Sequence, residues 1–323
     1  MYALVMGGTE FVGRNLAKYL LSQRYTVDLF TRGIKPLTYQ GVNSHLTGDR
    51  SHKEDLCRQL GSKQYDVVFD ISAYTKMHVK NLLEVLDTAA LKRYVFCSSG
   101  AVYTSTSSIT SESAERGLTL SWGDYGLHKM QAEDYLLDLY QKKNLPVVLF
   151  RPTYIYGEEN NLYRESFLFD RLAGELPIAL PEGTATKTQF LHIDDFVRTL
   201  ESAVHIPSAI GQAYNITHPE KVTWPALVQT AAKIVNKCPQ IRLVPPVKLK
   251  KLQITVRDFF PFRDITYLLN IEKLVNSGLH VPQINLSQGL SRAYHWYVTT
   301  KPVFNNKGME KLALLTDSLE SNG

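Results

Sequence analysis

The stretch "GGTEFVGR", residues 7–14, decides the fold because it directly follows the apolar run "YALVM" of residues 2–6. A strand, a glycine-spaced turn and an apolar helix start together present the free amide groups of a helix N-terminus to a phosphate. Gly7 permits the sharp turn, and Gly13 lets the helix pack closely on the sheet. The pattern is also compatible with a strand-to-helix turn that binds no ligand.

Glu10 occupies the middle position of the Gly-x-x-Gly-x-x-Gly spacing, where glycine normally lets the backbone approach a pyrophosphate. We place Glu10 in the first helical turn, where a carboxylate also favours the positive end of the helix dipole. We expect its side chain to point into solvent, so that only its backbone amide faces the phosphate.

Short β-branched or aromatic runs alternate with helix-length amphipathic segments through the first half of the chain. The predicted strands are "YALVM", "YTVDLFT", "DVVFDIS", "RYVFCSS" and "PVVLFRP", and the predicted helices begin at Val12, Glu54, Lys76 and Tyr125. Strands that are apolar throughout suit a parallel sheet covered on both faces. The sequence therefore predicts an α/β fold with a doubly wound parallel sheet of the Rossmann type.

Composition limits the class of protein. The chain has 323 residues, 44% of them hydrophobic, which is enough for one large domain or two modest ones. Its formal charge of +5 fits an anionic small ligand as well as nucleic acid. The three cysteines lack CxxC or Cys/His ligand spacing, which argues against a disulfide framework and against a metal site. Without a signal peptide or an apolar stretch of about 18 residues, we expect a cytoplasmic protein that does not bind membranes.

A second group of residues has the chemistry of proton transfer. The stretch "YGLHK" places Tyr125 and Lys129 four residues apart on a predicted helix, so both project from one face. A nearby ammonium stabilises a phenolate, so Lys129 is expected to lower the pKa of Tyr125 and make it a proton shuttle. Ser99 follows a buried strand, at the sheet edge where such folds bind ligands. A Tyr and a Lys on a solvated helix face are the alternative, which the glycine turn and Ser99 disfavour together.

Seven motifs occur along the chain in the order "GGTEFVGR", "GDR" at 48–50, "YVFCSSGAVY", "YGLHK", "RPTYIYG", "FLHIDDF" and "AYNI". This series resembles the extended short-chain dehydrogenase/reductases, the NAD(P)-dependent epimerase/dehydratase family, and in particular an atypical branch with a GGTxFVGR glycine turn. The resemblance implies a dinucleotide-binding domain of residues 1–155 and 187–216. A smaller, discontinuous substrate-binding domain would comprise residues 156–186 and 217–300, followed by a polar tail at 301–323.

By this resemblance Ser99, Tyr125 and Lys129 match the catalytic triad, and Lys129 would also bind the nicotinamide ribose. The cofactor-binding residues that we expect are Gly7, Thr9, Glu10, Phe11, Val12, Gly13, Thr31, Arg32, Asp49, Arg50, Ala73, Tyr74, Ser98, Tyr125, Lys129 and Pro152. The expected substrate contacts are Gly100, Asn161, Lys187 and Arg263.

The end of the second predicted strand bears on the choice of cofactor. Thr31 and Arg32 stand where an NAD-preferring protein of this kind offers an acid to the ribose hydroxyls. Arg32, like Lys35, is suited to pair with a 2′-phosphate, although a solvated turn cation is the alternative. The expected cofactor is therefore NAD or NADP, with NADP slightly favoured by Arg32.

The residues after Ser99 bear on the reaction. In dehydratases of the family one or two acidic residues follow the catalytic hydroxyl, whereas Gly100 and Ala101 follow it here. We therefore predict an epimerase or reductase that acts on a sugar, preferably a nucleotide-linked one. The alternative is a nucleic-acid-binding or regulatory protein, because the atypical branch includes chloroplast stem-loop RNA-binding proteins. A homodimer formed through the helix of Tyr125 is a further expectation from the resemblance.

Two acidic residues after the strand "TQFLHI" have a simpler expected role. Asp194 and Asp195 precede a predicted helix, so one of them is expected to cap its N-terminus. His192 is expected to be a strand residue with a structural partner.

Overall fold

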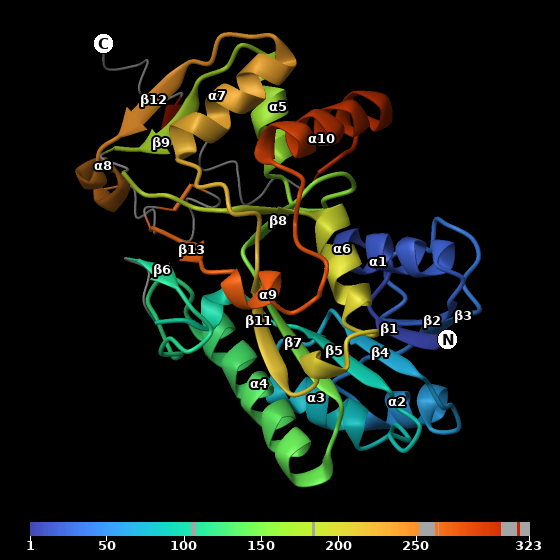
Figure 1. Cartoon of the computed structure of the whole chain (residues 1–323). Coiled ribbons are helices and arrows are strands. Elements are labelled where there is room, and N and C mark those ends of the chain that lie inside the picture. Colours follow the sequence, from blue (N-terminus) through green and yellow to red (C-terminus); the bar gives the residue numbers. More distant parts are fainter. Residues whose placement is uncertain (105–107, 183–184, 252–261, 264, 305–314, 317–323) are drawn as a thin grey trace.

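The computed structural model describes residues 1–104, 108–182, 185–251, 262–263, 265–304 and 315–316 (Figure 1). Most of the expected polar tail, residues 305–314 and 317–323, lies outside the described residues. Among the described residues, no helix combines the length and hydropathy that a membrane span requires.

A seven-stranded sheet forms the centre of the lower part of the molecule in Figure 1. Its strands are β1 (Tyr2–Met6), β2 (Thr26–Thr31), β3 (Ser44–Thr47), β4 (Val67–Asp70), β5 (Arg93–Cys97), β7 (Val147–Pro152) and β11 (Gln212–Ile216). They lie in the order β11-β7-β5-β4-β1-β2-β3, and every pairing is parallel. The predicted doubly wound sheet is confirmed, and its strand order reverses at β1, the point at which such sheets bind ligands.

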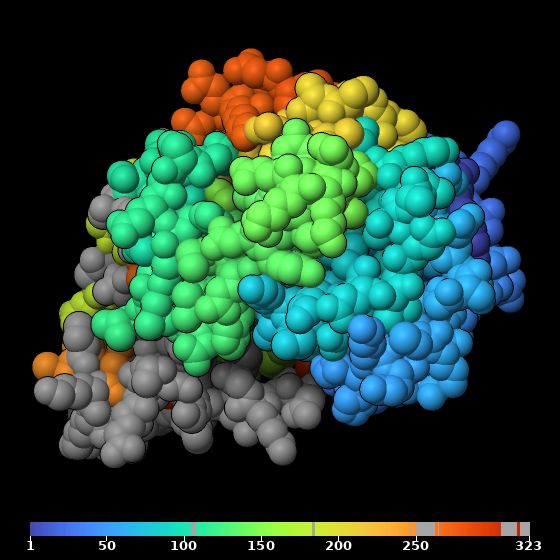
Figure 2. All heavy atoms as spheres, turned by 90° about the horizontal axis from the view of Figure 1, so that it is seen from below, coloured from blue at the N-terminus to red at the C-terminus, as the bar shows by residue number. Residues whose placement is uncertain are grey.

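Helices cover both faces of the sheet, which explains why its strands are apolar throughout. On one face lie α1 (Phe11–Ser22) and α6 (Ile193–Ser202), and on the other α2 (Lys53–Leu60), α3 (Lys76–Leu83) and α4 (Asp124–Lys143). Successive side chains of β1 alternate between the two cores. Ala3 packs with Leu16 and Phe196, and Leu4 packs with Leu56 and Leu136. Figure 2 shows the molecule from below, where the green atoms of α4 lie on the surface together with cyan segments of the α3 region.

The four predicted helix starts in the first half agree with the structure to within one residue. The helices begin at Phe11, Lys53, Lys76 and Asp124. The predicted N-cap of α6 is wrong: Asp194 and Asp195 are both inside the helix, and the His192 side chain accepts the capping bond from the Asp194 amide. The imidazole takes this position because its Nδ1 can accept a hydrogen bond as a carboxylate would.

A second group of elements lies above the sheet in Figure 1 and is drawn from the later part of the chain. It contains α5 (Glu165–Ala173), α7 (Trp224–Val235), α8 (Pro246–Lys251), α10 (Leu286–Thr300) and the parallel pair β9 (Ile178–Pro181) and β12 (Ile241–Val244). Phe169, Trp224 and Leu290 share its core. Because α5, α7 and α10 contact one another, these sequence-distant helices bury a common apolar surface.

Short elements connect the two groups. The parallel pair β8 (Tyr154–Tyr156) and β10 (Phe190–His192) leads from β7 toward the upper group. The parallel pair β6 (Ile109–Thr110) and β13 (Leu268–Leu269) and the helix α9 (Glu272–Val275) lie beside β11. Two 3-10 helices complete the described structure, η1 (Gly100–Val102) after β5 and η2 (Pro207–Ala209) after α6.

Candidate functional site

A cavity of about 770 Å³ runs along the carboxyl ends of the central strands. It begins at the turn after β1, passes the ends of β2, β4 and β5, and continues past the end of β7 toward residues of the second group. Open α/β sheets bind ligands in this position, and the volume suits an extended molecule.

Most of the residues that the sequence predicted for the site line this one cavity. They are Gly7, Thr9, Glu10, Phe11, Val12, Gly13, Thr31, Arg32, Asp49, Arg50, Tyr74, Ser98, Ser99, Tyr125, Lys129, Pro152, Asn161 and Arg263. The exceptions are Ala73, Gly100 and Lys187. Ala73 and Gly100 are buried beneath the lining, and Lys187 is exposed outside it.

The turn after β1 has the backbone that a pyrophosphate site needs. Gly7 and Gly8 have φ of +117° and +123°, a region that side chains disfavour. A Cβ on Gly13 would lie 2.5 Å from the Gly8 nitrogen, so only glycine allows α1 to approach this turn so closely. The fit to a dinucleotide therefore rests on the positive φ angles of the turn and on the close approach of α1, and a bulkier residue would destroy either one.

Glu10 differs from its expected position by one residue. It is the N-cap of α1, with extended backbone (φ −133°, ψ 153°), and does not belong to the first helical turn. Its side chain is exposed and makes no capping hydrogen bond. The amides of the first turn therefore remain available to an anion.

Arg50 lines the cavity, but its guanidinium is paired with a buried carboxylate and not with the cavity. Its guanidinium donates to both carboxylate oxygens of Asp70, at 2.7 and 2.8 Å, and to Ser72 at 2.9 Å. Burial alone would raise the pKa of Asp70, but Arg50 holds that pKa below its usual value. The pair therefore fixes the end of β4 and leaves Asp49, whose carboxylate accepts from the Ser51 amide at 2.8 Å, at the cavity surface.

Arg32 lies at the end of β2 and is exposed, as is Lys35 nearby. Both side chains line the same end of the cavity as Asp49. Thr31 holds the strand end in place, with 2.7 Å between its hydroxyl and His45 Nε2. An exposed arginine at this end is free to approach a 2′-phosphate or to stay in solvent.

Ser99, Tyr125 and Lys129 meet at the middle of the cavity. The Ser99 hydroxyl oxygen accepts from the Ala101 amide at 3.2 Å, which fixes it at the start of η1. Lys129 is buried, and its ammonium donates to the Cys97 carbonyl at 2.6 Å. The three side chains come from the end of β5 and the first two turns of α4.

The pKa of Tyr125 shifts against the direction expected from Lys129. Burial raises it and the neighbouring Cys97 adds to the rise, while a hydrogen bond with Ser99 opposes it. Burial also lowers the pKa of Lys129. The Lys129 ammonium donates to a backbone carbonyl, and burial of the phenol sets the direction of the pKa shift of Tyr125. Tyr125 is therefore a protonated phenol at neutral pH in this structure.

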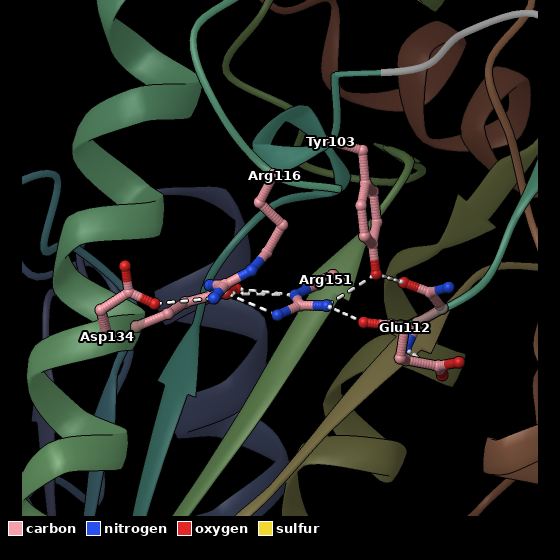
Figure 3. A network of polar contacts seen from close by, with 7 residues as sticks. Tyr103, Glu112, Arg116, Asp134 and Arg151 are labelled. Carbon is pink, nitrogen blue, oxygen red and sulfur yellow. Dashed lines mark hydrogen bonds and ion pairs between the residues drawn. The ribbon is translucent and has the colours of Figure 1, made fainter. Parts of the chain in front are cut away.

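A buried polar network behind these residues joins α4 to the sheet (Figure 3). Glu133, one helical turn after Lys129, accepts from Arg151 at 2.7 and 2.9 Å and from Arg116 at 2.8 Å. Arg151 also donates to the Tyr103 hydroxyl at 2.8 Å, and Tyr103 donates to Asn215 at 2.6 Å. Because Arg151 directly precedes Pro152, the network fixes α4 relative to β7, the strand that ends at the cavity.

The far end of the cavity is lined by aromatic and cationic side chains that the sequence analysis mostly missed. The Arg263 guanidinium lies 4.5 Å from the centre of the Trp122 ring and donates to the Ser121 carbonyl at 3.0 Å. Arg164 lines the same region, and Tyr267, whose ring packs on Trp122, lies between this end and the middle of the cavity. No local motif marks Trp122, Arg164 or Tyr267, since they become neighbours only when the second group of elements folds over the sheet.

Comparison with known proteins agrees with this architecture. A sequence model of the NAD dependent epimerase/dehydratase family matches residues 3–217. The chloroplast stem-loop binding protein of 41 kDa b of Arabidopsis thaliana is 29% identical over 305 residues, covering 90% of this chain and 78% of that protein. The UDP-glucose 4-epimerase of Vibrio cholerae is 25% identical over 274 residues, covering 77% of this chain and 80% of that protein.

Solved structures share the fold. The UDP-glucose 4-epimerase of Thermotoga maritima with UDP-glucose has a TM-score of 0.78 at 17% identity, covering 94% of this chain and 100% of that one. The UDP-glucuronic acid 4-epimerase of Bacillus cereus in complex with NAD has a TM-score of 0.75 at 20% identity, covering 92% and 96%. The family match spans most of the chain and includes the glycine turn, Ser99, Tyr125 and Lys129. This protein therefore belongs to the NAD dependent epimerase/dehydratase family.

Proposed function

We propose that the protein is an NAD(P)-dependent epimerase or reductase that acts on a sugar, with nucleotide-linked sugars as its preferred substrates. The observation behind the proposal is that Ser99, Tyr125 and Lys129 line the same cavity as the glycine turn after β1. The names of several similar proteins, UDP-glucose 4-epimerase among them, support this class of substrate.

The glycine turn and the uncapped first turn of α1 would hold the pyrophosphate, and Lys129 and Pro152 would lie beside the nicotinamide ribose and ring. Bound there, a nicotinamide accepts a hydride from a carbon that bears a hydroxyl, or returns one. Tyr125 exchanges the proton of that hydroxyl, and Ser99 binds the same oxygen. The protonated state of Tyr125 suits proton donation. Lys129, one helical turn away, would supply the positive charge that favours the reverse step.

Two features in and beside the cavity limit which type of reaction and which class of substrate we propose. Gly100 and Ala101 follow Ser99, so these positions offer no acid to expel water from a sugar. This favours epimerisation or reduction over dehydration. At the far end, Arg263 and Arg164 supply positive charge beside the Trp122 ring, a combination suited to an anionic, partly apolar ligand such as a nucleoside diphosphate.

The division into domains and the assembly follow the same proposal. Residues 156–186 and 217–300 would form the substrate-binding part, with residues 1–155 and 187–216 holding the cofactor. Lys187 and Gly100 would then act on the substrate site only indirectly. The exposed surface of α3 and α4 seen in Figure 2 would pair two copies of the chain.

The test is to incubate the purified protein with NAD⁺ or NADP⁺ and each of UDP-glucose, UDP-glucuronic acid and dTDP-glucose. Chromatography would detect epimers, and absorbance at the nicotinamide band would detect transient reduction. We expect turnover of at least one of these sugars. Loss of turnover in Tyr125→Phe with cofactor binding intact supports the mechanism, and no binding of either cofactor to the wild type would refute it.

A second candidate is nucleic-acid binding, favoured by one observation. The relative that is 29% identical over 90% of this chain is named as a stem-loop binding protein. The formal charge of +5 is compatible with this function. Retention of a stem-loop RNA that weakens steeply with salt, together with no affinity for a dinucleotide, would favour this candidate.

A further inference from the structure

Tyr267 reaches the reacting part of the cavity from the last third of the chain. It is buried, and its backbone amide donates to the Lys187 carbonyl at 2.8 Å. Its ring packs against Trp122 and Tyr154, with centroids 4.9 and 5.5 Å apart. The ring is therefore held from two sides, and its hydroxyl has a fixed position.

The hydroxyl of Tyr267 occupies the space beside Gly100. A Cβ built on Gly100 would lie 2.4 Å from the Tyr267 hydroxyl oxygen and 2.9 Å from Leu269 Cδ1. Any larger residue at position 100 would therefore have to displace the phenol from a closely packed site. Since Gly100 directly follows Ser99, the phenol stands next to the backbone that carries Ser99.

The hydroxyl of Tyr267 donates one hydrogen bond, which leaves its oxygen able to accept another. The hydroxyl donates to the Pro152 carbonyl at 3.1 Å, which ties it to the end of β7. Burial raises the pKa of Tyr267, and a hydrogen bond with Ser99 opposes that rise, as it does for Tyr125. Ser99 therefore lies within reach of two phenols, Tyr125 from α4 and Tyr267 from the C-terminal third.

We propose that Tyr267 is a positioning residue for Ser99, and that its hydroxyl takes the place of the side chain that residue 100 lacks. The Tyr267 oxygen accepts a hydrogen bond from the Ser99 hydroxyl until a substrate oxygen replaces it, which holds Ser99 in the orientation that the substrate requires. The reacting centre then presents three hydroxyls, from Ser99, Tyr125 and Tyr267. The catalytic part of this inference rests on the proposed function, whereas the position of the hydroxyl does not.

The position is tested by a double-mutant cycle of Gly100→Ala and Tyr267→Phe, read from urea unfolding. The substitution Tyr267→Phe removes only the hydroxyl and keeps the ring contacts. We expect Gly100→Ala to destabilise the protein clearly less when it is combined with Tyr267→Phe than when it is made in the wild type. The contact with Leu269 gives a residual cost in both backgrounds. Additive effects of the two substitutions would overturn the proposal.

The positioning role is tested with UDP-glucose and NAD⁺ as probes. We expect Tyr267→Phe to lower kcat about tenfold, the effect of one lost hydrogen bond, with KM and NAD⁺ affinity within about twofold. Tyr214→Phe, a buried tyrosine of β11 outside the cavity, should keep kcat and KM. An unchanged kcat in Tyr267→Phe would overturn the role in catalysis. Absence of turnover in the wild type would count against the proposed function, and the double-mutant cycle would still decide where the hydroxyl lies.

Discussion

The Lys129 ammonium donates a hydrogen bond to the Cys97 carbonyl, with 2.6 Å between Nζ and O. It also lies over the rings of Tyr74 and Phe96, at 5.4 and 5.1 Å from their centres. Cys97 is the last residue of β5, directly before Ser98 and Ser99. Lys129 thus fixes the helix of Tyr125 to the strand that delivers Ser99, in addition to any contact with a cofactor.

Replacing Tyr125 with Phe should remove turnover and leave the fold and cofactor affinity unchanged. The loss should be about 10²- to 10⁴-fold, the range expected when a general acid/base is removed. Initial rates and calorimetric titration of the cofactor measure the two effects. Tyr135→Phe, on the same helix but outside the cavity, is the matched control. Equal rates in the Tyr125 variant and the wild type would exclude Tyr125 from the mechanism.

Arg32 should decide between the two nicotinamide cofactors. We expect NADPH to bind more tightly than NADH, and Arg32→Ala to remove most of that difference. Because Arg32 is exposed, its contact with a 2′-phosphate should contribute only about 1 kcal/mol. Calorimetry with both cofactors measures the difference, and Lys142→Ala, an exposed cation of α4, should leave it unchanged. Equal affinities in the wild type would make Arg32 a solvated turn residue.

Glu10→Gly should change cofactor affinity by no more than a few fold. The carboxylate is exposed and therefore well solvated, and the backbone amide remains in the variant. Glu10→Gln is the matched variant, since it removes the charge without adding backbone freedom. If the carboxylate instead lay near the phosphates, repulsion of a few kcal/mol at an effective dielectric near 20 would be relieved. Cofactor affinity that is tenfold or more higher in both variants would show that the Glu10 carboxylate lies near the phosphates.

Glu133→Gln should destabilise the protein strongly. It leaves Arg151 and Arg116 without their shared carboxylate in a buried position, which costs about 3 to 5 kcal/mol. Urea unfolding measures the loss. Asp134→Asn changes the neighbouring exposed partner of Arg116 and should cost little. Similar losses of unfolding free energy in both variants would mean that the buried ion pair of Glu133 and Arg151 stabilises the protein no more than the exposed pair of Asp134 and Arg116.

Glu158 should make stability depend on pH in the acidic range. Burial alone would raise its pKa, but bonds to His192 and Arg292 lower it to about 2 from an ordinary 4.5. A carboxylate with a lowered pKa stabilises the fold above pH 4.5 and loses this effect as the pH falls toward 2. After allowance for partial exposure, the contribution is about 1 to 2 kcal/mol.

Unfolding of Glu158→Gln between pH 7 and pH 3 tests this dependence. The variant should lose less stability over this interval than the wild type. Glu159→Gln, which changes the adjacent carboxylate bound to Arg14 and Lys18, should keep the wild-type difference. Parallel curves for Glu158→Gln and the wild type would contradict the prediction.

Local sequence pattern was enough to predict those features that depend on residues close together in the chain. The turn of residues 7–14 and the spacing of Tyr125 and Lys129 were readable because backbone conformation and helical periodicity are local properties. Apolar runs predicted the strands because the sheet is covered on both faces. The one-residue error at Glu10 and the N-cap formed by His192 show the limit of local pattern. In both cases the exact start of a helix depended on a backbone or side-chain contact that several residue types can make.

The sequence by itself determined the parallel sheet and the glycine turn, and it singled out Ser99, Tyr125 and Lys129, which line one cavity in the structure. Only the tertiary structure decided what surrounds them. The Tyr267 hydroxyl packs against Gly100, and the Arg263 guanidinium lies over the Trp122 ring. Arg50 forms an ion pair with the buried Asp70. The tertiary structure also reversed the expected pKa shift of Tyr125, because burial is a property of the whole packed interior. Contacts between segments far apart in the chain leave no periodicity in the sequence, and the energy of burial depends on all of them together.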